Sequence, residues 1–149
     1  MTVRTILLIE DDPYDIQLTQ RAFRKADLIN ISLQIVQNGD DAVSYLSGSD
    51  EYADRDRFPL PVLLLLDLKL PRRNGLEVLE WLRQQPGLKR LPVIVLTSSK
   101  ESSELNKAYD LGANSYLVKP VGFTALQELV KTFNLYWLLL SELPQMPTN

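Results

Sequence analysis

The sequence of 149 residues contains no cysteine and no histidine. Without cysteine the chain can form neither disulfides nor thiolate metal sites, and its composition does not point to secretion. Without histidine it cannot use serine–histidine or cysteine–histidine nucleophiles, and it cannot bind zinc through imidazole. Any chemistry must therefore depend on carboxylates, hydroxyls, lysine and a hard metal ion.

The chain also lacks long apolar runs and a large excess of charge. Its longest apolar stretch is far too short to span a membrane, and residues 1–5 lead into a strand-like run without a signal peptide. The net charge of −3 gives no reason to expect binding along a nucleic-acid backbone. We expect one cytoplasmic domain, residues 1–149, that binds neither membranes nor nucleic acid.

The most informative segment is the apolar run at residues 62–66, which is followed by a single carboxylate, Asp67. A short apolar run without alternation is typical of a central strand in a parallel sheet that is covered on both faces. Asp67 then lies at the carboxyl end of that strand, the edge at which open α/β sheets bind ligands. We therefore expect Asp67 to be the central functional residue.

Strand-like and helix-like patterns alternate along the rest of the chain. Four further strands are expected at residues 3–9, 31–36, 92–96 and 114–118. Helices are expected at residues 13–26, after 39, after 75, from a capping box at 98–101, and from about 123 to 143. We expect residues 47–61 to form a long polar loop and no effector domain to follow the last helix. Five strand–helix repeats predict an α/β, doubly wound parallel sheet with the flavodoxin-like strand order 2-1-3-4-5.

That strand order brings acidic residues from two neighbouring strands together. Glu10 and Asp11 follow the first strand and Asp67 follows the third, so three carboxylates meet at one edge. They cannot all stay ionised without a counter-charge, and Mg²⁺ is the hard cation that carboxylates bind. Glu10, Asp11 and Asp12 can also be explained as helix-start residues, and Asp12 is expected to cap the first helix. With Asp67 beside them, a metal site is the favoured interpretation.

Two more polar residues follow the fourth and fifth strands. Thr97 alone is most simply a helix-start hydroxyl, and Lys119 alone is most simply a solvated lysine. At one edge with a metal-bound carboxylate, they form a site that stabilises a phosphoryl group through the metal, a hydroxyl and an ammonium. Asp67 is then the nucleophile of an aspartyl-phosphate.

These residues resemble the receiver domain of bacterial two-component response regulators over nearly the whole chain. The resemblance rests on the acidic pair after the first strand, on Asp67, on Thr97 and Lys119 at 30 and 52 residues beyond it, and on Tyr116. It implies that Asp67 accepts a phosphoryl group from a histidine of a partner kinase. It also implies that Thr97 and Lys119 contact that group and that Tyr116 changes rotamer with Thr97 as a switch.

The resemblance further implies how the metal is held. Asp11 and Asp67 would bind Mg²⁺ (or Mn²⁺) directly, Glu10 would act through a metal-bound water, and the Lys69 carbonyl would complete the protein ligands. Lys69 and Ser99 lie two residues after Asp67 and Thr97, where family members tune access of the hydrolytic water. We expect slow autodephosphorylation, with a phosphoryl lifetime longer than that of fast chemotaxis-type regulators.

Other, less specific features of the sequence are similar to those of the single-domain response regulators of cyanobacterial and other bacterial phytochromes. They are the long loop at 47–61, the stretch 64–72, the stretch 108–114 and the aromatic end of the last helix. This resemblance implies a phytochrome-type sensor histidine kinase as the partner.

The last helix is apolar on two sides toward its end. At 100° per residue, its core stripe is Leu126, Leu129, Val130, Phe133, Trp137 and Leu140. Its other apolar residues are Leu135, Leu138 and Leu139, with Tyr136 and Leu143 to one side. We expect a homodimer through this helix, and the alternative is that the tail folds back onto its own domain.

Two other classes of function remain to be compared with the receiver. A Mg²⁺-dependent aspartate-nucleophile phosphatase of the haloacid dehalogenase type is disfavoured, because such enzymes carry Asp-x-Asp near the N-terminus and Asp67 is followed by Leu68-Lys69. A flavodoxin is disfavoured, because acidic residues after the first strand repel phosphate. The second alternative is a phosphorylation-independent interaction module of the same fold. The complete set of five site residues argues against it.

Overall fold

Five parallel strands form one sheet in the order β2-β1-β3-β4-β5, as the sequence predicts. The computed structural model describes residues 3–28, 30–140 and 143–145, and the side chains of residues 139 and 140 lie outside this description. The strands are β1 (Arg4–Ile9), β2 (Ile31–Val36), β3 (Leu63–Leu66), β4 (Val93–Thr97) and β5 (Ser115–Val118).

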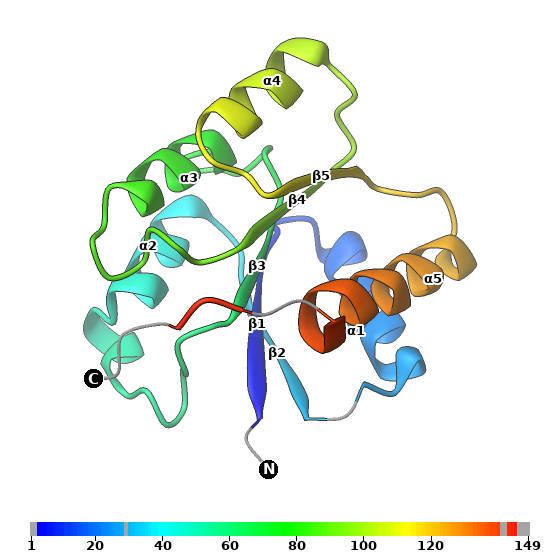
Figure 1. Ribbon diagram of the computed structural model, residues 1–149, viewed down its shortest axis with the longest axis horizontal. Helices are drawn as coiled ribbons and strands as arrows, with labels where there is room; N and C mark the ends of the chain where they lie inside the picture. Colours follow the sequence, from blue (N-terminus) through cyan, green and yellow to red (C-terminus); the bar gives the residue numbers. More distant parts are fainter. Residues whose placement is uncertain (1–2, 29, 141–142, 146–149) are drawn as a thin grey trace.

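Helices cover both faces of the sheet, so β1, β3 and β4 lie in the interior. Figure 1 shows α1 and α5 on one face and α2, α3 and α4 on the other. The helices are α1 (Pro13–Ala26), α2 (Gly39–Ser47), α3 (Gly75–Arg83), α4 (Ser102–Asp110) and α5 (Phe123–Phe133). A 3₁₀ turn, η1 (Asp50–Ala53), and a π-helical segment, η2 (Asn134–Leu140), complete the elements. None of the described helices is long and apolar enough to cross a membrane.

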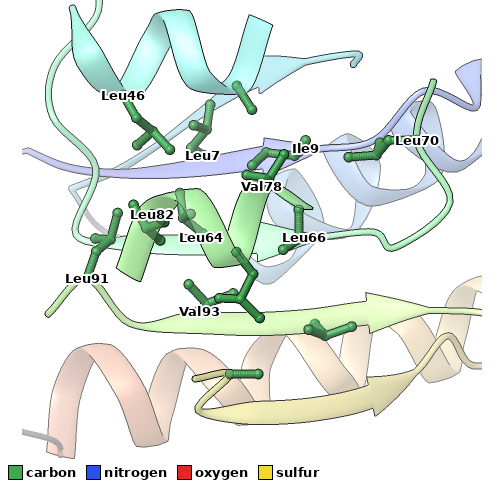
Figure 2. Close-up of a cluster of buried hydrophobic side chains, with 14 of the residues drawn as sticks. Leu7, Ile9, Leu46, Leu64, Leu66, Leu70, Val78, Leu82, Leu91 and Val93 are labelled. Carbon is green, nitrogen blue, oxygen red and sulfur yellow. The ribbon is translucent and has the colours of Figure 1, made fainter. Parts of the chain in front are cut away.

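The apolar strand β3 explains why the core has two halves. Successive side chains of a strand point to opposite faces. Leu64 and Leu66 therefore join the cluster beneath α2 and α3, which Figure 2 shows, and Leu63 and Leu65 join the cluster beneath α1 and α5. All four leucines have no exposed surface. The expectation of a central strand that is covered on both faces is confirmed.

The strand register brings the functional residues to one edge. Ile9 of β1 lies opposite Leu66 of β3, so the residues that follow them leave the sheet side by side. Thr97 lies opposite Val118 in the pairing of β4 with β5, and the Lys119 amide donates to the Thr97 carbonyl at 2.8 Å. Parallel pairing alone thus aligns the carboxyl ends of the four strands.

The long loop at 47–61 includes the last residue of α2 and the turn η1, and it is held by side chains that pack on α2. The rings of Tyr52 and Phe58 lie 5.1 and 5.9 Å from that of Tyr45. Arg55 donates to the carbonyls of Tyr45 and Leu46, which satisfies acceptors at the C-terminus of α2.

The capping box expected at residues 98–101 is wrong. Helix α4 begins at Ser102, and its N-cap, Glu101, makes no side-chain capping bond. The preceding residues are used in other contacts, because the Ser99 carbonyl accepts from the Tyr116 hydroxyl at 3.0 Å and the Ser99 amide donates to Thr97 Oγ1 at 3.4 Å. Tertiary contacts at the sheet edge therefore override the local capping pattern.

The end of the last helix also differs from the prediction. The α-helix stops at Phe133 and continues as the π-helix η2, whose i→i+5 bonding takes more residues per turn. The residue five positions after Phe133 is Leu138, and it is buried in the cluster beneath α1 and α5. Arg4 donates to the Leu138 carbonyl and fixes the segment to the start of β1.

These contacts correct part of the expected dimer surface. Leu138 packs on its own chain and not on the outer face, and Leu143 is half-buried against the same cluster, as in the fold-back alternative. Leu135 and Tyr136 are exposed, with 51% and 59% of their surface accessible. The side chain of Leu139 lies outside the described residues.

Candidate phosphoacceptor site

Three carboxylates meet at the carboxyl edge of β1 and β3. One carboxylate oxygen from each of Glu10, Asp11 and Asp67 lies within 4.8 Å of the other two. Glu10 and Asp67 are buried and Asp11 is exposed, so the cluster opens to solvent on one side. A set of three oxygen donors without nitrogen or sulfur suits a hard divalent cation, and the residues present therefore fit Mg²⁺ or Mn²⁺.

Glu10 is a buried carboxylate whose pKa is raised by its surroundings. Burial raises the pKa of Glu10 to about 7, and the charge of Asp67 adds to this rise, although hydrogen bonds from Lys119 and the Asp12 amide oppose it. The Asp12 amide donates to Glu10 Oε2 at 3.2 Å while the Asp12 side chain caps α1, as expected. Burial and the neighbouring carboxylate thus both disfavour the charged form of Glu10, and the hydrogen bond from Lys119 offsets part of this cost.

Lys119 supplies positive charge to the cluster. Its Nζ contacts Glu10 Oε1 and lies 2.9 Å from Asp15 Oδ2 and 2.9 Å from Asp67 Oδ2. Burial alone would lower the pKa of Lys119, but its three carboxylate partners outweigh burial and hold that pKa above its usual value. Lys119 is thus an ammonium at the side of the phosphoacceptor candidate.

Asp15 is a member of this network that sequence reasoning missed. It lies in the first turn of α1, where an acidic residue is readily explained by the helix dipole. The sequence did contain a signal that Asp15 lies near the site, because Asp15 follows Asp11 by four residues and the helix starts between them at Pro13. Only the path of the Lys119 side chain shows that Asp15 faces the site.

Asp67 has two carboxylate oxygens with different partners, one a backbone amide and the other a side-chain ammonium. Its Oδ1 accepts from the Lys69 amide at 3.1 Å, while Oδ2 faces Lys119. A Cβ atom on Gly75 would lie 2.3 Å from the Asp67 carbonyl oxygen and 2.7 Å from Leu68 Cα. Helix α3 can approach the end of β3 this closely only because residue 75 has no side chain.

Thr97 and Tyr116 form a second group beside the carboxylates. Thr97 has no exposed surface, and Tyr116 reaches over the loop after β4 to donate to the Ser99 carbonyl. The Tyr116 amide in turn donates to the Tyr109 hydroxyl on α4 at 3.1 Å. Among the described residues, no hydrogen bond joins the Thr97 hydroxyl to the Asp67 carboxylate or to Lys119 Nζ, and the Thr97–Lys119 contact at this edge is the backbone bond from the Lys119 amide to the Thr97 carbonyl.

An ion pair that the sequence did not indicate also crosses the edge. Lys69 Nζ lies 2.8 Å from Glu104 Oε1 on α4. The hydrogen bond from Lys69 holds the pKa of Glu104 below its usual value. The residue two positions after Asp67 is therefore tied to α4 through its side chain and to the Asp67 carboxylate through its amide.

Comparison with known proteins identifies the family. Residues 6–131 match the response regulator receiver domain. The chain belongs to this family. A curated relative, response regulator Rcp1 of Synechocystis, is 38% identical over 141 residues, which cover 95% of this chain and 93% of Rcp1.

Solved structures agree with the sequence comparison. The phosphorylated cyanobacterial phytochrome response regulator RcpA superposes with a TM-score of 0.89 at 35% identity, over 97% of this chain and 100% of RcpA. The Mn²⁺-bound form of Rcp1 superposes with a TM-score of 0.84 at 37% identity, over 95% of this chain and 99% of that one. Membership of this signalling family leaves the haloacid dehalogenase-type phosphatase without support.

Proposed function

We propose that this receiver accepts a phosphoryl group on Asp67 from a partner histidine kinase, and that Mg²⁺ or Mn²⁺ assists the transfer. The observation that carries the proposal is the position of the Asp67 carboxylate, which belongs to the oxygen cluster with Glu10 and Asp11 and lies 2.9 Å from the Lys119 ammonium. A buried nucleophile beside an ammonium, in a cluster that fits a divalent cation, is what the transfer of an anionic group requires.

Different residues of the site would have separate roles in the reaction. Glu10, Asp11 and Asp67 would hold the metal, with the Lys69 carbonyl as a further proposed ligand, and the metal supplies charge stabilisation when bound. An Asp67 oxygen attacks the phosphorus atom as the bond from phosphorus to the donor imidazole breaks, and the imidazole leaves with the donor. Lys119, whose Nζ lies 2.9 Å from Asp67 Oδ2, stabilises the phosphoryl oxygens.

We further propose that Thr97 and Tyr116 transmit the change. A phosphoryl group on Asp67 would attract the buried Thr97 hydroxyl, and movement of Thr97 would disturb the loop that Tyr116 holds through the Ser99 carbonyl. The surface formed by α4, β5 and α5 is then the two-state element. Autodephosphorylation is proposed to be slow.

The relatives support a phytochrome-type kinase as the donor. RcpA is described as a cyanobacterial phytochrome response regulator, and its likeness extends over nearly the whole of this chain. A cytoplasmic location belongs to the same proposal, since a receiver must meet the kinase domain of its sensor.

A direct labelling experiment tests the function. The protein is incubated with acetyl phosphate and Mg²⁺ and analysed by intact-mass spectrometry, with Asp67→Asn as the matched variant. A stable gain of one phosphoryl group that is absent in the variant supports the receiver. Continuous turnover of acetyl phosphate would indicate an enzyme, and the absence of labelling would indicate a phosphorylation-independent interaction module.

A homodimer through the end of α5 is a second element of the proposal. It is favoured by Leu135 and Tyr136, two large side chains that are half or more exposed on η2. Sedimentation equilibrium of the wild type and of Leu135→Glu, with and without phosphorylation, tests it. A wild-type monomer at micromolar concentration in both states would contradict the dimer.

A further inference from the structure

Lys119 uses all of its hydrogen-bonding capacity in the unphosphorylated protein. An ammonium has three N–H donors, and Lys119 Nζ has three carboxylate partners, Glu10, Asp15 and Asp67. Two of these partners, Glu10 and Asp67, also belong to the cluster that fits a divalent cation. The lysine and the metal therefore share two ligands.

Sharing creates a competition between two cations. An ammonium that bridges Glu10 and Asp67 neutralises the same charge that attracts a divalent cation, and it repels that cation at short range. The ammonium cannot leave the site altogether, because the proposed transfer requires positive charge beside Asp67. A third partner that lies outside the metal cluster would resolve this conflict.

Asp15 has the required position. It contacts Lys119 at 2.9 Å but does not belong to the metal cluster, and it comes from α1 and not from a strand end. The side chain of Asp15 is 33% exposed, compared with 3% for Glu10 and 8% for Asp67, so it lies at the solvent side of the lysine. Helix α1 is fixed at this point by the Asp12 cap, which holds Asp15 beside the lysine.

We propose that Asp15 is a positioning residue that retains the Lys119 ammonium when a divalent cation takes over Glu10 and Asp67. It lowers the electrostatic cost of metal binding while the lysine stays within reach of Asp67. The inference rests on the proposed function and deepens it, because it assigns to this chain a carboxylate that acts through Lys119 and not by binding the metal.

The simpler role for Asp15 is stabilisation of α1 through the helix dipole. That role changes the free energy of unfolding but does not depend on Lys119. A readout of cation binding with and without the lysine therefore separates the two roles.

The test measures binding of Mn²⁺ alone to the unphosphorylated chain of 149 residues, by water-proton relaxation. Asp15→Asn is expected to weaken Mn²⁺ binding about fivefold, because the ammonium is then shared by Glu10 and Asp67 only. Lys119→Met is expected to tighten binding, because the competing cation is gone. In the Lys119→Met background, the Asp15→Asn change is expected to shift affinity by less than about twofold.

Asp12→Ser is the matched control, since it removes one negative charge from the same helix start and keeps a capping hydroxyl. Circular dichroism confirms that each variant is folded. The inference is overturned if the Mn²⁺ affinity of Asp15→Asn equals that of the wild type or that of Asp12→Ser. It is also overturned if Asp15→Asn weakens Mn²⁺ binding equally in the Lys119→Met background. Labelling of the wild type by acetyl phosphate tests the proposed function separately, because the Mn²⁺ measurements do not use phosphorylation.

Discussion

Arg83, at the C-terminus of α3, is predicted to be the polar side chain whose loss destabilises this fold most. Its guanidinium donates to the carbonyls of Lys89 at 2.8 Å, Leu91 at 2.7 Å and Gly112 at 2.6 and 3.1 Å. A fifth bond, at 3.2 Å, reaches Asn114 Oδ1, which also accepts from the Val93 amide at 2.8 Å. One side chain thus joins the connection before β4 to the connection before β5.

The expected loss follows from these contacts. Burial lowers the pKa of Arg83 from its ordinary value, yet the group remains charged at neutral pH. A hydrogen bond from a charged donor contributes about 1.5–3 kcal/mol, but the contributions do not add, and water can replace several partners at this partly exposed site. We expect Arg83→Met to lower the free energy of unfolding by about 2–4 kcal/mol, a large share of the 5–15 kcal/mol that is typical of a domain.

Urea denaturation followed by tryptophan fluorescence and circular dichroism measures this loss. Arg83→Lys should fall between the wild type and Arg83→Met, because an ammonium cannot reach as many carbonyls. Arg90→Met is the control, since Arg90 is an exposed arginine in the same connection. A loss below about 1 kcal/mol for Arg83→Met, or one equal to that of Arg90→Met, would refute the reasoning.

Three further predictions concern other parts of the chain. Burial raises the pKa of Tyr45 from 10.0 to about 12, so the folded state binds more protons between these values and stability should fall as pH rises through them. Tyr45→Phe should flatten that fall in urea midpoints measured from pH 9 to 12. Gly75→Ala should displace the end of β3 and slow labelling of Asp67 by acetyl phosphate at least tenfold, whereas wild-type rates would show that the loop adapts. Glu104→Gln should free Lys69 and change the half-life of the phosphorylated protein severalfold, and an unchanged decay curve would contradict a role for this ion pair.

The sheet and most of the carboxylate site could be predicted from the sequence because both follow from local residue patterns along the chain. The apolar run before Asp67 predicts a strand that is buried on both faces, and parallel order then brings Glu10 and Asp11 beside it. The start of α1 was equally clear, because Asp12 and Pro13 combine a capping side chain with a favoured first residue.

The features that were missed depend on where long side chains and distant loops lie in space. The start of α4 is set by the contact of Tyr116 with the Ser99 carbonyl, 17 residues apart, which no local capping pattern records. Asp15 could be assigned to the site only once the path of Lys119 was known. The burial of Leu138 depends on a change from α- to π-helical winding, whereas a constant 100° per residue places that side chain on the opposite face.

These observations give Lys119 a place in the stability of the protein as well as in its chemistry. Apolar packing on both faces fixes the ends of β1 and β3, and their register forces Glu10 and Asp67 together whether or not a metal is bound. Two buried carboxylates at this distance need a cation, and Lys119 is the cation that the chain itself supplies. A divalent metal must therefore displace a resident charge, so its affinity depends on how easily Lys119 can move. If Lys119 stabilises the phosphoryl group as proposed, the same lysine also limits how tightly the unphosphorylated site can bind a metal.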